Sequence, residues 1–257
     1  METGATEASI LLMHWDGARL QWAVGREGVC LSAGEEVADG AEHAVEVIAQ
    51  LRGKGLQAEQ VLWSRRHAAC VFVPEPLNGA AAFALEHGFA PSLRATRSDR
   101  FENGLTCWEP QEESVEQAVL KAWPMARVVS GNLGWLEAIH RREQGQTDAA
   151  IYLDISPARS YWSRWSAGTF RGAMATSDRL PENLLYQIAN ALHRDQVNPA
   201  TVRVHLSGEE EPALRALFER FFKEVSEVEP FRKWEGSELQ LKPGRWAVLW
   251  NLEACAS

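Results

Sequence analysis

Apolar and polar positions follow the same order of patterns in each half of the chain. In the first half, three strand-like runs are joined by tight turns, the first of them at Asp16-Gly17. An amphipathic helical pattern begins at Asp39, and two more strand-like runs follow it. The predicted segments are residues 9–15, 19–24 and 29–32 (strands), 39–51 (helix), and 60–64 and 69–73 (strands). Together they predict a βββαβ unit.

The second half repeats this order from residue 149 onward. A buried run ends at Asp154, the chain turns through Ser156-Pro157, and a strand rich in aromatic residues leads through a turn at Gly168 into a third strand. Pro181 marks the first turn of the next helix, where a missing backbone N–H costs nothing. The later predicted segments are residues 178–193 (helix), 201–206 (strand), 209–222 (helix), and 225–228 and 246–250 (strands).

The pattern between the two repeats is less regular. The predicted segments there are residues 79–87 (helix), 101–108 (strand), 114–123 (helix), 126–130 (strand) and 132–143 (helix). The short polar stretch 144–147 is the predicted boundary, which divides the chain into lobes at 1–144 and 145–257. Two βββαβ units predict an α/β protein with two similar lobes, each a mixed sheet with helices packed on it.

Composition narrows the possible partners. The formal net charge is −9, and the chain has no run of lysine and arginine. This argues against nucleic acids and anionic membranes, because both need a basic patch on the protein. No run approaches the ~20 apolar residues of a membrane span, and residues 1–9 lack the basic and apolar parts of a secretory signal. We therefore expect a cytoplasmic protein without a membrane span.

The cysteines and the known catalytic motifs give no sign of a reaction centre. Cys30, Cys70, Cys107 and Cys255 are scattered, with no CxxC spacing and no nearby histidine partner. We therefore expect buried, reduced thiols, and neither a metal site nor a disulfide framework. The GxSxG, HExxH, Walker-type and GxGxxG motifs are missing from the sequence, so no catalytic residue is predicted.

Several stretches resemble the actin-like ATPase fold, the superfamily of actin, the seventy-kilodalton heat-shock chaperones and the sugar kinases. They are residues 133–140, 152–170, 184–186 and 204–209, together with 71–77 in the first half. Residues 151–228 also resemble the second half of an uncharacterised bacterial family of domain-of-unknown-function proteins. The resemblance implies a two-lobed, ribonuclease H-like fold.

The resemblance also implies a nucleotide site. In that superfamily ATP lies between the lobes, cradled by two hairpins, with two acidic residues near its metal and a third loop near the adenosine. The candidate nucleotide-binding residues are Asp16 and Gly17 (first hairpin), Asp154 and Ser156 (second hairpin), and Ser207 and Gly208 (third loop).

Both hairpins depart from the pattern that binds phosphate. A phosphate cradle needs backbone N–H groups that point at the oxygens, and glycines that let the backbone come close. The second hairpin has no glycine and contains Pro157, which has no N–H. The first keeps only Gly17, which an ordinary Asp-Gly turn explains equally well. The acidic run at residues 209–211 would repel a nucleotide unless a metal or an arginine compensates. We therefore predict a degenerate site, with no cofactor and no metal.

Single residues near these motifs have structural explanations as well as functional ones. Asp154 is the best candidate for acid–base chemistry, but a strand-end aspartate bonded to nearby backbone N–H groups explains it too. His14 and His205 lie in predicted strands and are expected to be bonded in the core or at the edge of the cleft. Arg65 and Arg66 are expected to be solvated.

Three functional hypotheses remain open. The first is a pseudo-ATPase scaffold that binds an unidentified protein partner, by analogy with the actin-like platform protein of type IV pilus machines. A homodimer is one form that this hypothesis allows. The second is an ATP-binding, slowly hydrolysing ATPase with Asp16 and Asp154 on Mg²⁺. The third is carbohydrate binding through Tyr161, Trp162 and Trp165. Replacing Asp154 with alanine separates the first two, because a scaffold would lose modest stability and an ATPase would lose metal-dependent binding.

Overall fold

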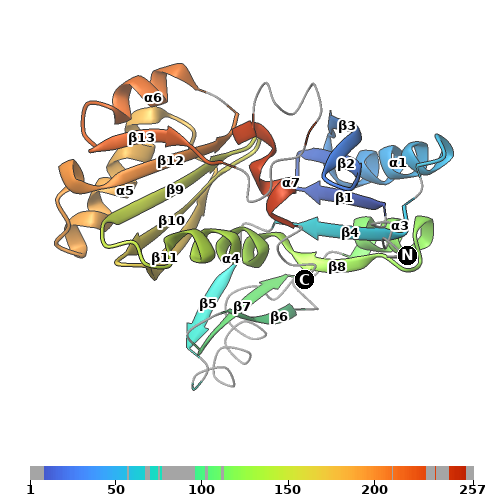
Figure 1. The fold of residues 1–257 in the computed structure, drawn as a ribbon, viewed down its shortest axis with the longest axis horizontal. Coiled ribbons are helices and arrows are strands. Elements are labelled where there is room, and N and C mark those ends of the chain that lie inside the picture. The colour runs from blue at the N-terminus through green and yellow to red at the C-terminus, as the bar shows by residue number, and fades with distance from the viewer. Residues whose placement is uncertain are drawn as a thin grey trace, which may run out of the picture.

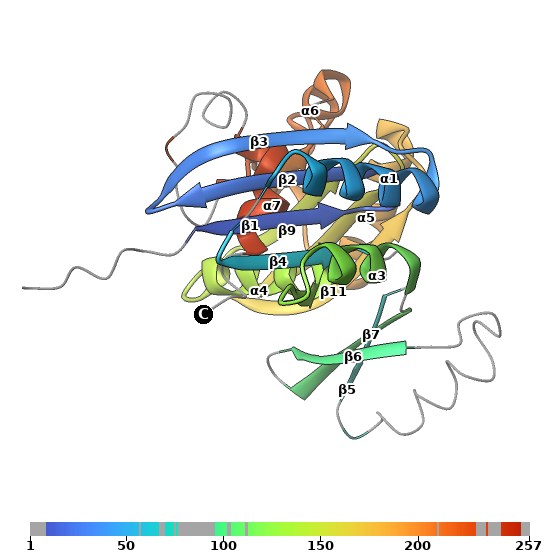
Figure 2. The ribbon, with the colours of Figure 1, turned by 90° about the vertical axis from the view of Figure 1, so that its right-hand side faces the viewer.

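The computed structural model describes residues 9–56, 58–66, 70–74, 76, 96–101, 104–110, 113–209, 211–229, 235 and 243–252. Within these residues the chain forms two five-stranded sheets and one three-stranded sheet. Figure 1 shows the two larger sheets at opposite ends of the molecule, with α4 (Gly131–Glu143) and α7 (Ala247–Asn251) between them. Figure 2 shows the small sheet set apart from the first large sheet. The predicted two-lobed α/β architecture is confirmed.

The first sheet has the strand order β3-β2-β1-β4-β8. Its strands are β1 (Ile10–Trp15), β2 (Arg19–Arg26), β3 (Val29–Val37), β4 (Gln60–Arg65) and β8 (Arg127–Ser130). In β1, Leu11 and Met13 pack against helices α1 (Gly40–Gly53) and α3 (Glu113–Ala122), whereas Leu12 packs with the residues of α7 on the other face. β1 is apolar except for His14, because both of its faces are buried.

The second sheet repeats this arrangement in the order β11-β10-β9-β12-β13. Its strands are β9 (Ala149–Ile155), β10 (Ser160–Ser166), β11 (Thr169–Thr176), β12 (Arg203–Gly208) and β13 (Glu224–Glu227). Helices α5 (Pro181–Arg194) and α6 (Pro212–Phe218) cover one face through a core that contains Leu184 and Leu214. On the other face, Tyr152 packs with Leu136 and Ile139 of α4. The duplication predicted from the sequence is confirmed.

The third sheet corrects two predictions for the middle of the chain. It has the order β5-β7-β6, with β5 (Val71–Pro74), β6 (Thr96–Phe101) and β7 (Leu105–Pro110). The strand predicted at 101–108 corresponds mainly to β7, and the sequence analysis missed β6, with which β7 forms a hairpin. Gly104, which directly precedes β7, has φ +71°. The strand predicted at 69–73 pairs with β7 and not with the first sheet, whose fifth strand is β8. The helix predicted at 79–87 lies outside the described residues.

Two further predictions are wrong near the C-terminus. The strand predicted at 246–250 is helical, with a 3-10 turn at Pro243–Trp246 that leads into α7. All residues of α7 are buried, so the apolar run has no alternation that could separate helix from strand. The helix predicted at 209–222 shortens to α6, because β12 extends to Gly208 and Pro212 then occupies the first helical turn.

Helix α4 joins the two lobes. Ser130 caps it by accepting the backbone N–H of Leu133 at 3.1 Å, and most of its residues are buried. Gly131 has no room for a side chain, because a Cβ there would lie 2.7 Å from the carbonyl oxygen of Arg65. α7 contacts β1 of the first sheet and β12 of the second, so it also links the two lobes. The lobe boundary at residue 144 stays a prediction. Among the described residues, no helix combines the length and apolarity needed to cross a membrane.

Candidate functional site between the two sheets

The polar residues between the lobes come from corresponding strand ends of the two sheets. β1 and β4 are parallel with Trp15 opposite Arg65, so the residues that follow them, Asp16 and Arg66, leave the same edge. In the second sheet, Asp154 of β9 lies opposite Ser207 of β12. All four side chains are buried, and their position at the carboxyl ends of parallel strands is where α/β proteins bind ligands.

An ion pair joins the two lobes at this point. Arg66 Nη1 donates to Asp154 Oδ2 at 2.6 Å, and the arginine side chain is 0% exposed. Its guanidinium carbon lies 4.5 Å from the ring centre of Trp135 and 4.4 Å from that of Tyr161. A planar guanidinium stacks well on aromatic faces, so α4 and β10 hold the cation in place. The expectation that Arg66 is solvated is wrong.

Asp154 is bonded to side chains from two other strands. Besides Arg66, it accepts the hydroxyl of Ser207 on Oδ1 at 2.6 Å. The sequence analysis predicted other partners for Asp154, namely nearby backbone N–H groups. Both carboxylate oxygens therefore accept hydrogen bonds from the protein. These bonds compensate the charge of a residue that is only 3% exposed.

The first hairpin uses its own aspartate to satisfy its backbone. Asp16 Oδ1 accepts the N–H groups of Ala18 at 3.0 Å and Arg19 at 2.7 Å. Burial raises the pKa of Asp16, the charge of Asp154 adds to this, and Arg19 and the two N–H bonds oppose it. Gly17 makes the turn with φ +97°. These N–H groups therefore point at the carboxylate of the same turn, and a phosphate would have to compete with it.

The second hairpin and the third loop are bonded to each other. The N–H of Ser156 donates to the carbonyl of Arg159 at 2.8 Å, and the N–H of Glu209 donates to the carbonyl of Ile155 at 2.8 Å. Gly208 lies so close that a Cβ there would be 2.0 Å from the same Ile155 oxygen. The structure therefore places the third loop against the second hairpin, and the contact between them is made by bonds within the protein. That Ser156 and Gly208 bind a nucleotide stays a prediction.

A cavity of about 550 Å³ opens beside Gly208. Its charged lining consists of Glu209, Glu211, Glu227, Arg215 and Arg245. An arginine compensates part of the acidic run, because Arg179 Nη2 lies 2.9 Å from a carboxylate oxygen of Glu209 and 2.9 Å from one of Glu211. The space lies at the loop that the resemblance assigns to the adenosine.

The two histidines near the hairpins are held by serines. His14 Nδ1 lies 2.7 Å from Ser64 Oγ, and its pKa is lowered by burial and then by the charges of Arg66 and Arg19. His205 Nδ1 lies 2.9 Å from Ser226 Oγ, and burial, with a smaller effect of nearby arginines, lowers its pKa to about 4. Both are neutral at pH 7, as expected for histidines bonded in the protein interior.

The aromatic residues of β10 do not form an exposed platform. Tyr161, Trp162 and Trp165 are each at most 3% exposed. Tyr161 covers Arg66, and Trp165 packs in the core that contains α4. These positions leave no flat aromatic surface on this strand for a sugar.

The sequence matches no protein-family model and no curated protein. Among solved structures, a Bacteroides thetaiotaomicron protein of unknown function with an actin-like ATPase fold superposes with a TM-score of 0.73 at 12% identity, over 89% of this chain and 93% of that one. The chain has the actin-like ATPase fold. Because the identity is low, the similarity shows the fold alone.

Two other solved structures are similar to this chain over almost its whole length. A chain of the PilM-PilN type IV pilus biogenesis complex matches with a TM-score of 0.64 at 12% identity, over 96% of this chain and 98% of that one. The cytoplasmic domain of EpsL, an inner membrane component of the type II secretion system of Vibrio cholerae, matches with a TM-score of 0.51 at 13% identity, over 97% and 95%.

Six candidate residues were predicted from the sequence, and the prediction missed Arg66, which is bonded to Asp154, and Trp135, which stacks on Arg66. Arg66 follows the buried strand β4 in the same way that Asp16 follows β1. Because parallel neighbouring strands end at one edge, this spacing was a signal that Arg66 would face the other lobe. Trp135 had no such signal, since its position depends on how α4 lies across the two sheets.

Proposed function

We propose that this chain is a non-catalytic actin-like protein that acts by binding a protein partner. The observation that carries the proposal is the buried Arg66–Asp154 ion pair at the candidate metal position. Mg²⁺ on Asp154 would have to displace the guanidinium from the carboxylate and from its two aromatic neighbours. Breaking a buried ion pair costs about 3–5 kcal/mol, and each 1.4 kcal/mol weakens binding tenfold, so metal binding would be weakened roughly a hundredfold or more.

The backbone of the hairpins supports the same proposal. The N–H groups of residues 18, 19, 156 and 209 all donate to acceptors within the protein. Phosphate sites instead direct such groups at the ligand. A nucleotide-free role is therefore the one that fits these contacts best, and we propose that the site now serves to fix the two lobes relative to each other.

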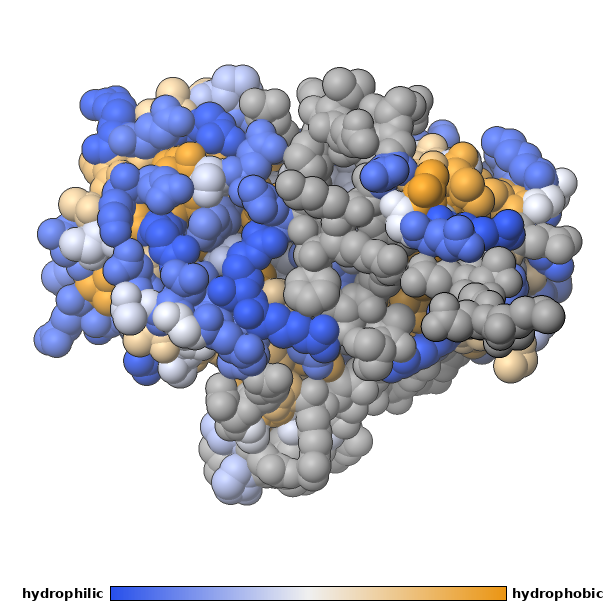
Figure 3. Space-filling view, viewed as in Figure 1, coloured by the Kyte–Doolittle hydropathy of each residue, from blue (hydrophilic) through white to orange (hydrophobic). Residues whose placement is uncertain are grey.

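A protein partner is supported by the surface of this chain and by two solved structures with a similar fold. β3 is the outermost strand of the first sheet and is bonded on its outer side to Glu235 next to Val29. It exposes Val29, Leu31 and Val37 at 40%, 58% and 63%. Figure 3 shows apolar surface on the first lobe, in the region where Figure 1 places β3 and α1. Exposed apolar residues on an edge strand favour a protein contact. The pilus complex and the secretion-system domain have the same fold and belong to protein assemblies, the latter in the cytoplasm.

Affinity capture with charged surface variants tests this proposal. The protein is immobilised and exposed to extract of its own cells, and Leu31→Glu is compared with Met125→Glu, which changes a residue that is 89% exposed outside β3. A partner should be retained by the wild type and by Met125→Glu, and lost with Leu31→Glu. Equal retention by all three would contradict the use of β3. Sedimentation velocity over a range of concentrations shows whether a second copy of the chain is the partner.

ATP binding is the second candidate function, and the cavity beside Gly208 favours it. A volume of about 550 Å³ is within the range of small-molecule pockets. Under this alternative a nucleotide would bind through its base, with Asp16 and Asp154 on Mg²⁺ only after the ion pair opened. Nucleotide titration separates the two proposals.

A further inference from the structure

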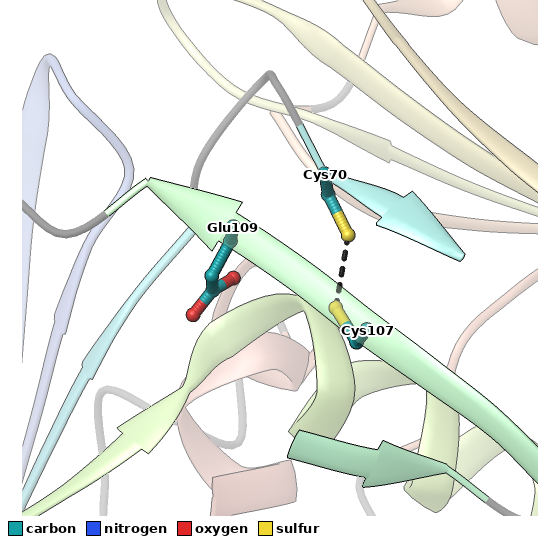
Figure 4. Close-up of side chains that lie close together, drawn as sticks. All are labelled: Cys70, Cys107 and Glu109. Atoms are coloured by element: carbon teal, nitrogen blue, oxygen red, sulfur yellow. Dashed lines mark hydrogen bonds between the residues drawn. The ribbon is translucent and has the colours of Figure 1, made fainter. Parts of the chain in front are cut away.

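Three potential metal ligands gather on the small sheet. Cys70 directly precedes β5, and Cys107 and Glu109 lie on β7. Their ligand atoms all lie within 4.8 Å of one another, and the two sulfur atoms are 3.0 Å apart. Figure 4 shows the two sulfurs facing each other across the strands, with the carboxylate of Glu109 beside them.

The strand register explains why residues so far apart in sequence meet. β5 and β7 are antiparallel with Val71 opposite Trp108, which places Cys70 opposite Glu109. Cys107 is two residues before Glu109 and therefore lies on the same face of the sheet. Cys107 and Glu109 are buried, while Cys70 is partly exposed and gives a cation access from solvent.

We infer that Cys70, Cys107 and Glu109 bind a thiophilic divalent cation, with Zn²⁺ as the best match. Two thiolates and a carboxylate are a donor set that zinc accepts, and a fourth position remains for water or another ligand. Tetrahedral Zn²⁺ with bonds of ~2.3 Å holds two sulfurs ~3.8 Å apart. The two sulfurs, at 3.0 Å, would have to move apart by about 0.8 Å to bind Zn²⁺ in this geometry.

The surroundings of Glu109 support a metal site. Its Oε2 accepts the hydroxyl of Ser130 at 2.9 Å and the amide of Asn132 at 3.3 Å. Such outer hydrogen bonds orient a carboxylate toward a metal. Ser130 also caps α4, so a cation here would tie the small sheet to the helix whose Trp135 stacks on Arg66.

The third side chain distinguishes a metal site from a disulfide. Cys70 and Cys107 are reduced thiols that lie diagonally across the two strands. The ligand atoms of Glu109 and of both cysteines lie within 4.8 Å of one another. A metal would use all three side chains, whereas Glu109 would have no role in a disulfide.

Cobalt substitution in the reduced protein tests the inference. Co²⁺ is titrated into the wild type, Cys70→Ser, Glu109→Gln and the control Cys30→Ser, and Zn²⁺ is then added in competition. We expect a thiolate-to-cobalt charge-transfer band that saturates at one equivalent and is removed by Zn²⁺. The band should persist in Cys30→Ser and be lost in Cys70→Ser, while Glu109→Gln should weaken binding. Asn132→Ala should reduce zinc affinity by about 10- to 100-fold.

Three results would overturn the inference. They are the lack of a charge-transfer band in the reduced wild type, an undiminished band in Cys70→Ser, or a Cys70–Cys107 disulfide found by mass spectrometry in a protein that takes up no metal after reduction. Circular dichroism of each variant confirms that it is folded. Cys70→Ser is the main variant because Cys70 is partly exposed, so its replacement disturbs the core least.

Discussion

Arg66, which follows a strand of the first sheet, and Asp154, in a strand of the second, are bonded at 2.6 Å in the interior of the protein. The pair links two lobes that are built on the same strand order. Trp135 and Tyr161 enclose the guanidinium, so the contact is fixed by packing as well as by charge. The residues of the candidate nucleotide site therefore also hold the two lobes together.

Removing one partner of this pair should destabilise the protein strongly. Arg66→Met leaves Asp154 buried without its cation, and we expect the free energy of unfolding to fall by about 3–5 kcal/mol, measured by urea denaturation at pH 7. Asp154→Ala should cost a similar amount, which is more than the modest loss expected from the sequence. The control Arg171→Met changes an exposed arginine and should be close to neutral.

The double variant Arg66→Met, Asp154→Leu separates charge from packing. If the cost of the single variant comes from an uncompensated buried charge, the double variant should recover most of the lost stability. This explanation is contradicted if the double variant loses as much stability as the two single variants together.

Two glycines with similar backbone angles should respond differently to alanine. Gly208 and Gly17 have φ +85° and +97°, so both replacements carry the backbone strain of a left-handed conformation, about 1–2 kcal/mol. Only at Gly208 would the new Cβ collide, at 2.0 Å from the Ile155 carbonyl, whereas nothing lies within 4 Å at Gly17. Thermal unfolding should therefore show a clearly larger loss for Gly208→Ala. Equal losses would mean that β12 and the second hairpin do not approach as described.

The hydroxyl of Tyr152 should matter because it holds a buried carboxylate. It donates to Glu143 Oε1 at 2.8 Å, and Arg203 is farther away at 3.4 Å. Tyr152→Phe should lower the free energy of unfolding by about 1–3 kcal/mol, because the carboxylate loses its shorter bond. Tyr186→Phe is the matched control, since Tyr186 is 72% exposed. A loss of the same size in both variants would refute this role.

The sequence predicted the repeated strand order because each strand carries its own local signals. The alternation in β2, the turn at Asp16-Gly17 and Pro181 in the first turn of α5 can each be read within a few residues. The errors arose where burial on all sides removes periodicity, as in α7, or where partners are distant in sequence. Cys70 and Cys107 meet only through the pairing of β5 with β7, and Arg66 meets Asp154 only when the lobes assemble.

Acidification should destabilise the protein through His205. Its pKa falls from 6.5 to about 4 on folding, so below pH 6.5 the unfolded chain binds a proton that the folded protein does not. The stability is therefore complete above pH 6.5 and is lost as the pH falls toward 4, by up to about 2 kcal/mol between pH 7 and pH 5. His205→Asn should reduce this dependence in urea unfolding and leave the part that comes from His14, whose pKa folding also lowers. His193→Gln, an exposed control, should leave the dependence unchanged.

The His205→Asn variant also distinguishes the effect of His205 on the pH dependence of stability from that of Asp16. The raised pKa of Asp16 acts in the opposite sense, because the folded protein then binds its proton at a higher pH than the unfolded chain does. An unchanged pH dependence in His205→Asn would contradict the assignment.

The measurement that tests the central claim most directly is calorimetric titration of the purified protein with ATP and with ADP, each with and without Mg²⁺. A closed phosphate site predicts no detectable heat of binding at millimolar nucleotide in either condition. Micromolar binding that requires Mg²⁺, and that is lost in a folded Asp154→Asn variant, would contradict the scaffold proposal and establish a working nucleotide site.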